Sequence, residues 1–215
     1  MPLGALVLPH FVDLDPSLTA LHRLGGFFVL RTAGGADRSL PTLARTSGPG
    51  RPDVHGDLPT TRVRRVADAL GTPEERVAAS VAQQGLAARL WSVALGSAAL
   101  HGAVPDLAPP LLRWDPEAGA PDDLWPAGAR PLPGDAGTIA RLVPHGHLEP
   151  LAGALRARHR IAPGLLRGNA ASALAGAARE PDHWGRRHGR TDVSARARPP
   201  AAELLAHPSS PGPEP

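Results

Sequence analysis

The chain contains no cysteine and no tyrosine, and its basic residues include no lysine. Without cysteine it can form neither a disulfide nor a thiolate metal centre, and it has no thiol nucleophile. All 23 basic residues are arginines, but the net charge is only +3, so composition alone is weak evidence for nucleic-acid binding. No run of about 18 uncharged apolar residues is present, and the sequence therefore predicts no membrane span.

Proline and glycine are abundant instead, with 26 and 24 copies among 215 residues. This content predicts a folded chain with many interruptions. We expect one domain over residues 1–207, with a loop or linker at about 38–60, and a disordered proline-rich tail at 208–215. The N-terminal stretch "MPLGALVLPHFVDLDP" lacks the basic start of a secretory signal, which favours a cytoplasmic protein.

The clearest element in the sequence is a long helix within "GTPEERVAASVAQQGLAARLWSVALGSAALHG". Thr72 is a candidate N-cap with Glu75 three residues later, and Gly102 is a stop signal at the other end. Apolar residues at helical spacing, which include Val77 and Val81, predict a broad buried stripe. This helix is the expected central scaffold of the fold.

The remaining segments divide into helices and short extended pieces. Helical spacing predicts further helices at 14–24, 147–161 and 162–178. The "FFVLRT" stretch at 27–32 is a strand candidate, and short pieces between prolines at 103–144, such as "IARLVP", favour strands or extended turns. Prolines at 181 and 199–200 predict interruptions of the C-terminal helices. The predicted fold class is α+β, mainly α-helical, with a few short strands.

The chain contains ten histidines, which raises the question of whether some of them bind a metal ion. His145 and His147 form the tightest pair, and His159, His183 and His188 follow in the sequence. No carboxylate stands at a recognised ligand spacing, and the gap between His183 and His188 does not put both rings on one helical face. Solvent-exposed loop histidines are therefore the favoured interpretation, and we predict no metal site.

The familiar catalytic motifs are also missing, so we predict no catalytic residue. No serine lies in a Gly-x-Ser-x-Gly elbow, and no phosphate-binding glycine motif opens a helix. Between Arg156 and Arg198, ten arginines stand against three acidic residues. This pattern favours a solvated basic face, and it leaves open the binding of nucleic acid, an anionic ligand or an acidic partner. Because only Trp184 interleaves with these arginines, nucleic acid is the less favoured partner.

Three segments stand in order along the chain: "SVAQQGLAARLWSVALGSAALHG", "LLRWDPEAGAPDDLW" and "PLAGALRARHRIAPGLLRGNAASALAGA". Together they resemble the body of the FhuF-like ferric-siderophore reductase family, whose actinobacterial members are commonly named (2Fe-2S)-binding proteins. The resemblance covers roughly residues 14–205 and is strongest over 80–178. It implies a largely helical cytoplasmic scaffold with a role in iron homeostasis.

In that family the chemistry lies in a short C-terminal segment, where a Cys-Cys pair and a following Cys-x-x-Cys hold a [2Fe-2S] cluster. The resemblance implies that the cluster passes one electron to ferric iron in a siderophore, so that ferrous iron is released. This chain ends with "ELLAHPSSPGPEP" and has no cysteine, so it can supply none of the cluster ligands. We therefore expect a truncated or frame-shifted family member, or a paralogue that has lost its redox chemistry. Such a chain binds no cofactor and retains at most the binding of a ferric siderophore.

Five residues are the candidates for this ligand site: Trp114, Trp125, Arg167, Asn169 and Ser172. The tryptophans are possible walls of a cleft, and the other three lie in the stretch that matches the family body. Asn169 is the only asparagine in the chain, and its favoured interpretation is a polar packing group between close helices. The alternative function is a non-enzymatic basic module that binds nucleic acid or an acidic protein.

Overall fold

One long helix, α3 (Glu75–His101), forms the centre of the molecule, and the other helices pack around it. The computed structural model describes residues 18–30, 40–46, 52–54, 58–115, 124–126 and 130–206. In these residues helices predominate and strands pair only two at a time, so the predicted mainly helical α+β class is confirmed. The predicted tail at 208–215 lies outside the described residues.

The two ends of α3 differ in how well the sequence predicted them. Gly102 follows the helix in the left-handed conformation with a φ of 71°, and its N–H donates to the carbonyl of Ala98 over 2.9 Å, as expected of a glycine stop. The start is two residues later than a Thr72 cap would place it. The Thr72 hydroxyl instead accepts from the backbone N–H of Glu74 over 3.2 Å, so it stabilises the turn before the helix.

α3 is buried on almost every side along its C-terminal two thirds, from Ala82 to Ala99. The predicted stripe is therefore wrong at its N-terminal end, where Val77 and Val81 are 43% and 42% exposed. The physical reason is that neighbouring helices enclose the later turns of α3 on most sides but leave one side of the first turns open to solvent. Burial in the later turns therefore does not depend on a single apolar face.

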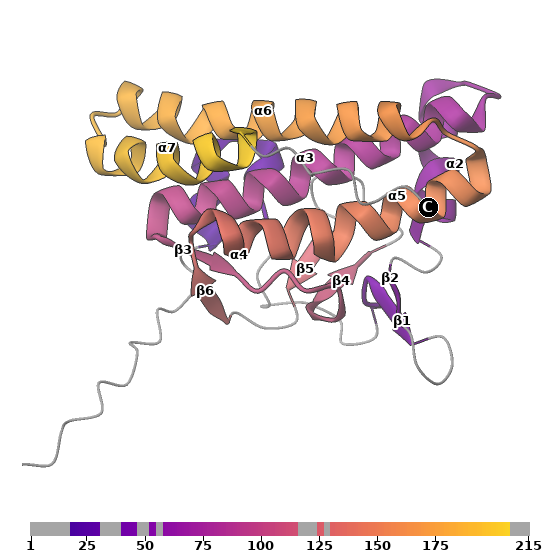
Figure 1. Cartoon of the computed structure of the whole chain (residues 1–215), viewed down its shortest axis with the longest axis horizontal. Helices are drawn as coiled ribbons and strands as arrows, with labels where there is room; N and C mark the ends of the chain where they lie inside the picture. The colour runs from indigo at the N-terminus through magenta and orange to yellow at the C-terminus, as the bar shows by residue number, and fades with distance from the viewer. Residues whose placement is uncertain are drawn as a thin grey trace, which may run out of the picture.

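The longer helices packed around α3 are α2 (Leu58–Leu70), α5 (Glu149–His159), α6 (Pro163–Arg187) and α7 (Thr191–Ala206). Helix α6 lies along α3, and α7 folds back beside α6 over only part of its length (Figure 1). Helix α5 lies on the other side of α3 in this view. Helices α5 and α6 thus confirm the helical segments predicted at 147–161 and 162–178.

Both α6 and α7 continue through the prolines that were expected to interrupt them. A proline inside a helix removes one backbone hydrogen bond and costs roughly 3 kcal/mol. Pro181 and Pro200 are both buried in the folded chain, and the apolar area that their rings remove from water offsets part of this cost. Tertiary packing therefore overrides the local preference.

The chain before α3 follows its predicted structure only in part. The helix predicted at 14–24 is helical in its described residues, with α-helix at 18–20 and a 3₁₀ turn, η1 (Leu21–Leu24), after it; residues 14–17 lie outside the described residues. The predicted strand at 27–32 is wrong over its first residues, which form a second turn, η2 (Gly26–Phe28). Gly25, with a φ of 124°, redirects the chain so that Phe28 packs against α3.

The strands form three two-stranded antiparallel sheets. Their members are β1 (Ala44–Thr46) with β2 (Pro52–Val54), β3 (Ala103–Pro105) with β6 (Pro131–Pro133), and β4 (Leu112–Trp114) with β5 (Leu124–Pro126). A 3₁₀ turn, η3 (Pro109–Leu111), precedes β4. These pieces confirm the short extended segments predicted for much of 103–144.

The predicted linker at about 38–60 is wrong in its described part, because it carries β1, β2 and the start of α2. Its backbone also pairs with β4: the N–H of Leu43 donates to the carbonyl of Leu112 over 2.8 Å, and that of Trp114 to Pro41 over 2.9 Å. Leu43 itself is buried in the core. These long-range contacts have no local sequence pattern.

The "IARLVP" segment is helical rather than extended, in α4 (Ala136–Ala140) and a π-helical segment, η4 (Arg141–Leu148). Asp135 begins α4 as its N-cap, since its Oδ1 accepts from the N–H of Thr138 over 2.8 Å. The backbone hydrogen bond from Thr138 is the largest of the causes that hold the pKa of Asp135 below its usual value. Pro144 lies inside η4, where the wider π-helical turn accommodates it.

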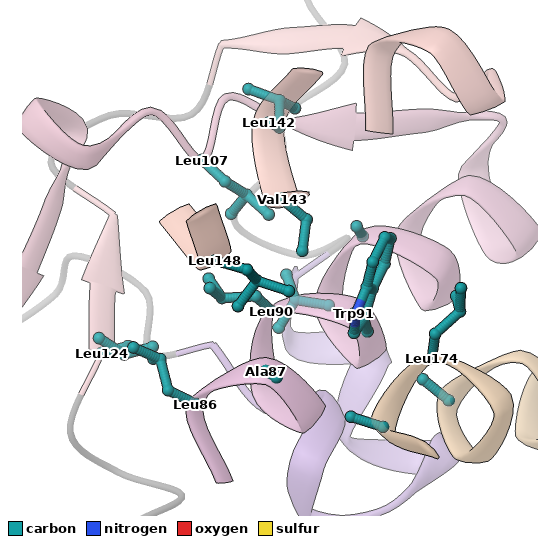
Figure 2. Close-up of a cluster of buried hydrophobic side chains, with 14 of the residues drawn as sticks. Leu86, Ala87, Leu90, Trp91, Leu107, Leu124, Leu142, Val143, Leu148 and Leu174 are labelled. Atoms are coloured by element: carbon teal, nitrogen blue, oxygen red, sulfur yellow. The ribbon is translucent and has the colours of Figure 1, made fainter. Parts of the chain in front are cut away.

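The core is one continuous cluster that extends from Leu18 to Leu204 along the chain. Figure 2 shows part of it, in which Leu90 and Trp91 of α3 lie on the side of Leu107 and Val143, and Leu86 lies toward Leu124. The cluster thus joins α3 to η4 and to the segment after β3.

Close packing of Phe28 on α3 depends on Gly96. A Cβ added there would lie 2.6 Å from Cδ1 of Phe28, which is closer than packing allows. We expect Gly96→Ala to lower the free energy of unfolding by about 1–3 kcal/mol. Gly85→Ala on the same helix is the matched control, because nothing lies within 4 Å of its added Cβ. It should stabilise the protein by about 0.5–1 kcal/mol. Urea unfolding measures both, and equal effects would contradict the packing.

Candidate functional site

A cleft of about 330 Å³ lies between the segment after β3, the start of β6 and the helical segment η4. Its lining residues are Asp106, Ala108, Pro109, Arg130, Leu132, Arg141, Leu142 and Gly146. Apolar side chains therefore form much of its surface, and the charged groups come from three separate parts of the chain. We call it the arginine cleft.

Backbone hydrogen bonds hold two sides of the arginine cleft together. The N–H of Asp106 donates to the carbonyl of Arg130 over 2.9 Å, which extends the β3–β6 pairing by one residue. The N–H of Gly134 donates to the carbonyl of Gly102 over 3.2 Å. A Cβ at Gly134 would lie 2.8 Å from that carbonyl oxygen, so only glycine permits this close approach of the two backbone segments.

The third side of the cleft belongs to η4. Its first residue, Arg141, is exposed and adds a charge to the cleft, whereas Leu142 beside it is buried and packs into the core. Gly146 allows the backbone to pass close to the carbonyl oxygen of Arg141, from which an added Cβ would be 3.2 Å away. π-helical turns often occur at functional sites, because they displace side chains from the regular helical register.

Electrostatically, the cleft carries two arginines and one carboxylate. The guanidinium groups of Arg130 and Arg141 have no ion-pair or hydrogen-bond partner among the described residues, and both side chains are exposed. Asp106 is half-buried, and its Oδ1 accepts from the N–H of Ala108 over 3.1 Å. Two arginines, whose side chains bind anions well, and one aspartate therefore line the same cleft.

His147 lies behind the cleft and ties η4 to the segment after β3. Its ring is fully buried, and Nε2–H donates to the carbonyl of Leu107 over 2.6 Å. Burial lowers the pKa of His147 from its usual 6.5 to about 4, although the bond to Leu107 favours the protonated form. The ring is therefore neutral at neutral pH and serves the packing of the cleft wall.

The paired histidines of the sequence do not converge on one point. The Nδ1 of His145 lies 2.9 Å from Oε1 of Glu149 on the exposed side of η4, whereas His147 points into the core. His159 is buried near Glu75, and His188 stacks on Trp184. Among the residues that the structure describes, no three histidine or acidic side chains form a group that could hold a metal ion.

Trp114 and Trp125 lie on the same small sheet but face opposite sides of it. Trp114 is directly opposite Leu124 in the pairing, and Trp125 is opposite Arg113, so the two rings alternate across the strands. Trp114 packs into the core, while Trp125 lies half-buried on the other face. The structure does not bring them together as two walls of one cleft, and neither lines the arginine cleft.

The other three candidates lie on α6. Asn169 donates from Nδ2 to Oγ of Ser80 over 2.8 Å and to the Ser80 carbonyl over 3.2 Å, which links α6 to α3. One turn away, Nε2 of the buried Gln83 donates to the carbonyl of Leu166 over 3.3 Å. Arg167 and Ser172 are exposed on α6. Asn169 is thus part of a polar contact between two helices, the kind of role that its surroundings in the sequence favoured.

Acidic residues neutralise much of the basic C-terminal region. Asp182 forms ion pairs with Arg186 and Arg198, and Asp192 does so with Arg190 and Arg196. The hydrogen bond from Arg190, followed by that from Arg196, holds the pKa of Asp192 well below its usual value.

Arg196 also binds the end of the central helix. Its Nε donates to the carbonyl of Ala99 over 2.8 Å and its Nη2 to that of Leu100 over 3.1 Å. These are free carbonyls of the last turn of α3, where the helix dipole favours positive charge. One of the arginines that suggested a basic binding face is therefore a structural cap.

Sequence reasoning did not identify the arginine cleft. Arg130 and Arg141 are 11 residues apart and stand in segments that were predicted to be extended. The one local signal was Asp135 followed by Thr138, which predicts a helix start between the two arginines. Only the pairing of β3 with β6 brings Asp106 to the same place.

No protein-family model, curated protein or solved structure matches the chain. None of the helices within the described residues has both the length and the apolar composition needed to cross a lipid bilayer. The geometry of the described residues therefore carries the functional argument.

The buried, neutral His147 predicts a loss of stability in mild acid. In the unfolded chain His147 binds a proton below pH 6.5, but in the folded chain only below about pH 4, so stability falls as the pH drops through this window. Between pH 7.5 and 5 the loss from this group is about 2 kcal/mol. His147→Gln, which can still donate to Leu107, should lose correspondingly less in urea unfolding. Equal losses in the two proteins would contradict this assignment.

The contact between Asn169 and Ser80 predicts different effects of two substitutions on α6. Asn169→Ala leaves the half-buried Ser80 hydroxyl without this partner and should lower the free energy of unfolding by about 1–2 kcal/mol. Ser172→Ala, on the exposed side of the same helix, should change it by less than about 0.5 kcal/mol. Thermal unfolding of both variants checks this, and equal stability of Asn169→Ala and the wild type would contradict a structural role.

Proposed function

We propose that the chain is a redox-inactive relative of the FhuF-like ferric-siderophore reductases that binds an anionic ferric chelate in the arginine cleft. The observation that carries the proposal is the pair of arginines, Arg130 and Arg141, which line one cleft and have no partner among the described residues. A charged group without an internal partner is available to a ligand.

The donor set of the chain does not fit a [2Fe-2S] cluster. Such a cluster needs thiolates for at least two of its four ligands, and the chain has no cysteine. Histidines do not compensate, because His145 and His147 point in different directions and no group of three metal-binding side chains occurs among the described residues. The proposal therefore includes binding of the iron complex and no electron transfer.

The chemistry of the cleft suits a ferric chelate, because hard Fe³⁺ is held by oxygen ligands that are partly or fully anionic. The planar guanidinium groups of Arg130 and Arg141 can each donate two parallel hydrogen bonds to such oxygens. The partly exposed Ala108, Pro109 and Leu132 offer apolar surface to the carbon skeleton of the chelator. The cleft is open, so a chelate can bind with its larger part in solvent.

The alternative, a basic module that binds nucleic acid or an acidic protein, has weaker support. Asp182 and Asp192 pair with four arginines of the basic stretch, which reduces the positive field that a polyanion would meet. Binding to random duplex DNA that falls steeply with salt would favour this alternative over ferric chelates.

Ferric chelates and matched arginine variants test the proposed function. The purified full chain is mixed with ferric catecholate, hydroxamate or citrate complexes, and the iron retained with the protein is measured after ultrafiltration. The double variant Arg130→Gln/Arg141→Gln should weaken retention of an anionic chelate at least about tenfold, since charge-assisted hydrogen bonds are lost. Arg167→Gln, which removes an exposed arginine on α6, is the control and should have less than a twofold effect.

Two results would contradict the proposal. One is the absence of retained iron with every chelate at high micromolar concentration. The other is an equal loss of binding in Arg167→Gln and in the double variant, which would show that net charge rather than the cleft governs binding.

A further inference from the structure

We infer that the arginine cleft recognises a small hydroxycarboxylate with at least two carboxylates, and that it binds the acid through these groups whether or not iron is present. This inference rests on the proposed function, because it names the class of chelator that the same site takes. The volume of the cleft, its charges and one oxygen of Asp106 carry it.

The size of the cleft limits the ligand. At about 330 Å³ it lies at the lower end of the range of small-molecule sites, which is roughly 300–1,000 Å³. A large siderophore would leave most of its surface outside such a cleft. A short-chain acid can instead bring all its polar groups into contact with the lining residues.

The two arginines define the anionic groups of that acid. Arg130 precedes β6 and Arg141 begins η4, so the two arginines of the lining come from two different elements. Each matches the geometry of one carboxylate in a bidentate pair. The half-buried Pro109 and Leu132 give the cleft an apolar surface that suits a short carbon skeleton separating two carboxylates.

Asp106 adds a requirement that a simple dicarboxylate does not meet. Its Oδ1 already accepts from Ala108, and its Oδ2 has no partner among the described residues. A ligand carboxylate at this point would be repelled, whereas a hydroxyl group can donate to Oδ2. The combination of two guanidinium groups and one free acceptor therefore selects a hydroxyl group in addition to the carboxylates.

The frame of the site is held before any ligand arrives. The backbone bond between Asp106 and Arg130 holds the two chain segments of the site side by side, and the Nε2–H bond of His147 to Leu107 fixes η4 against the first of them. Preorganisation of this kind lowers the entropic cost of binding. Selectivity for the hydroxyl group should therefore be measurable in a cleft that is open to solvent.

Citrate and tricarballylate form the test pair, because they differ only by the hydroxyl group. Isothermal titration of the full chain with each metal-free acid, at low and constant ionic strength, should give about tenfold tighter binding of citrate. Sulfate serves as the control for a general anion site and should bind more weakly than both. Arg130→Gln/Arg141→Gln should weaken the binding of both acids, as is expected for the ferric chelates.

Asp106→Ala tests the origin of the selectivity. It removes the negative charge for both acids alike, so the ratio of the two dissociation constants isolates the hydroxyl contact, and this ratio should fall to about 1. Asp106→Asn keeps an oxygen that can accept from Ala108 and replaces the second oxygen with an amide nitrogen that cannot accept a hydrogen bond from the ligand hydroxyl. It should lower the ratio as well, and it guards against a folding defect in the alanine variant.

The outcomes separate this inference from the proposed function. If ferric chelates bind in an arginine-dependent way but citrate and tricarballylate bind equally, or not at all, the hydroxycarboxylate class is overturned and the proposed function stands. A ratio that is unchanged in both Asp106 variants would likewise overturn the role of Asp106. If neither the ferric chelates nor the metal-free acids bind, both proposals fail. Sulfate that binds as tightly as citrate would reduce the cleft to a general anion site.

Discussion

Burial of α3 is the constraint on which the rest of the structure depends. Its small side chains let α6 approach closely enough for Asn169 and Gln83 to form hydrogen bonds between the two helices. Gly96 on the same helix receives the ring of Phe28, which brings the N-terminal turns into the core. Arg196 of α7 then binds the carbonyls at the end of α3. A specific contact with α3 thus places α6, the N-terminal turns and α7.

The arginine cleft forms where this central helix ends. Gly102 turns the chain into β3, and the close approach of Gly134 to Gly102 brings the start of α4 to the same place. The pairing of β3 with β6 then aligns Asp106 with Arg130. Local turn chemistry and one long-range backbone contact together create a site whose charged residues come from distant parts of the sequence.

Much of the helical fold was predictable, because its signals are local. Helical spacing in α3 and α5 and the glycine after α3 act over a few residues, and the structure follows them. The prediction was wrong where a distant contact decides the outcome. Helix α6 continues past Pro181, which is buried in the folded chain, and the segment around Leu43 is ordered by backbone hydrogen bonds to β4. Cap residues such as Asp135 were a usable signal that the proline-rich context obscured.

The sequence by itself determined that this chain cannot supply thiolates, because no cysteine is present anywhere in it. It also determined the mainly helical class, since the spacing of apolar residues indicates which helix faces are buried when the chain folds. Only the tertiary structure decided which arginines remain available to a ligand. Asp182 and Asp192 pair with some, a helix end binds Arg196, and Arg130 and Arg141 stay without partners among the described residues. Whether an arginine forms an ion pair depends on distances between side chains in the folded protein, and these distances cannot be read from the order of residues along the chain.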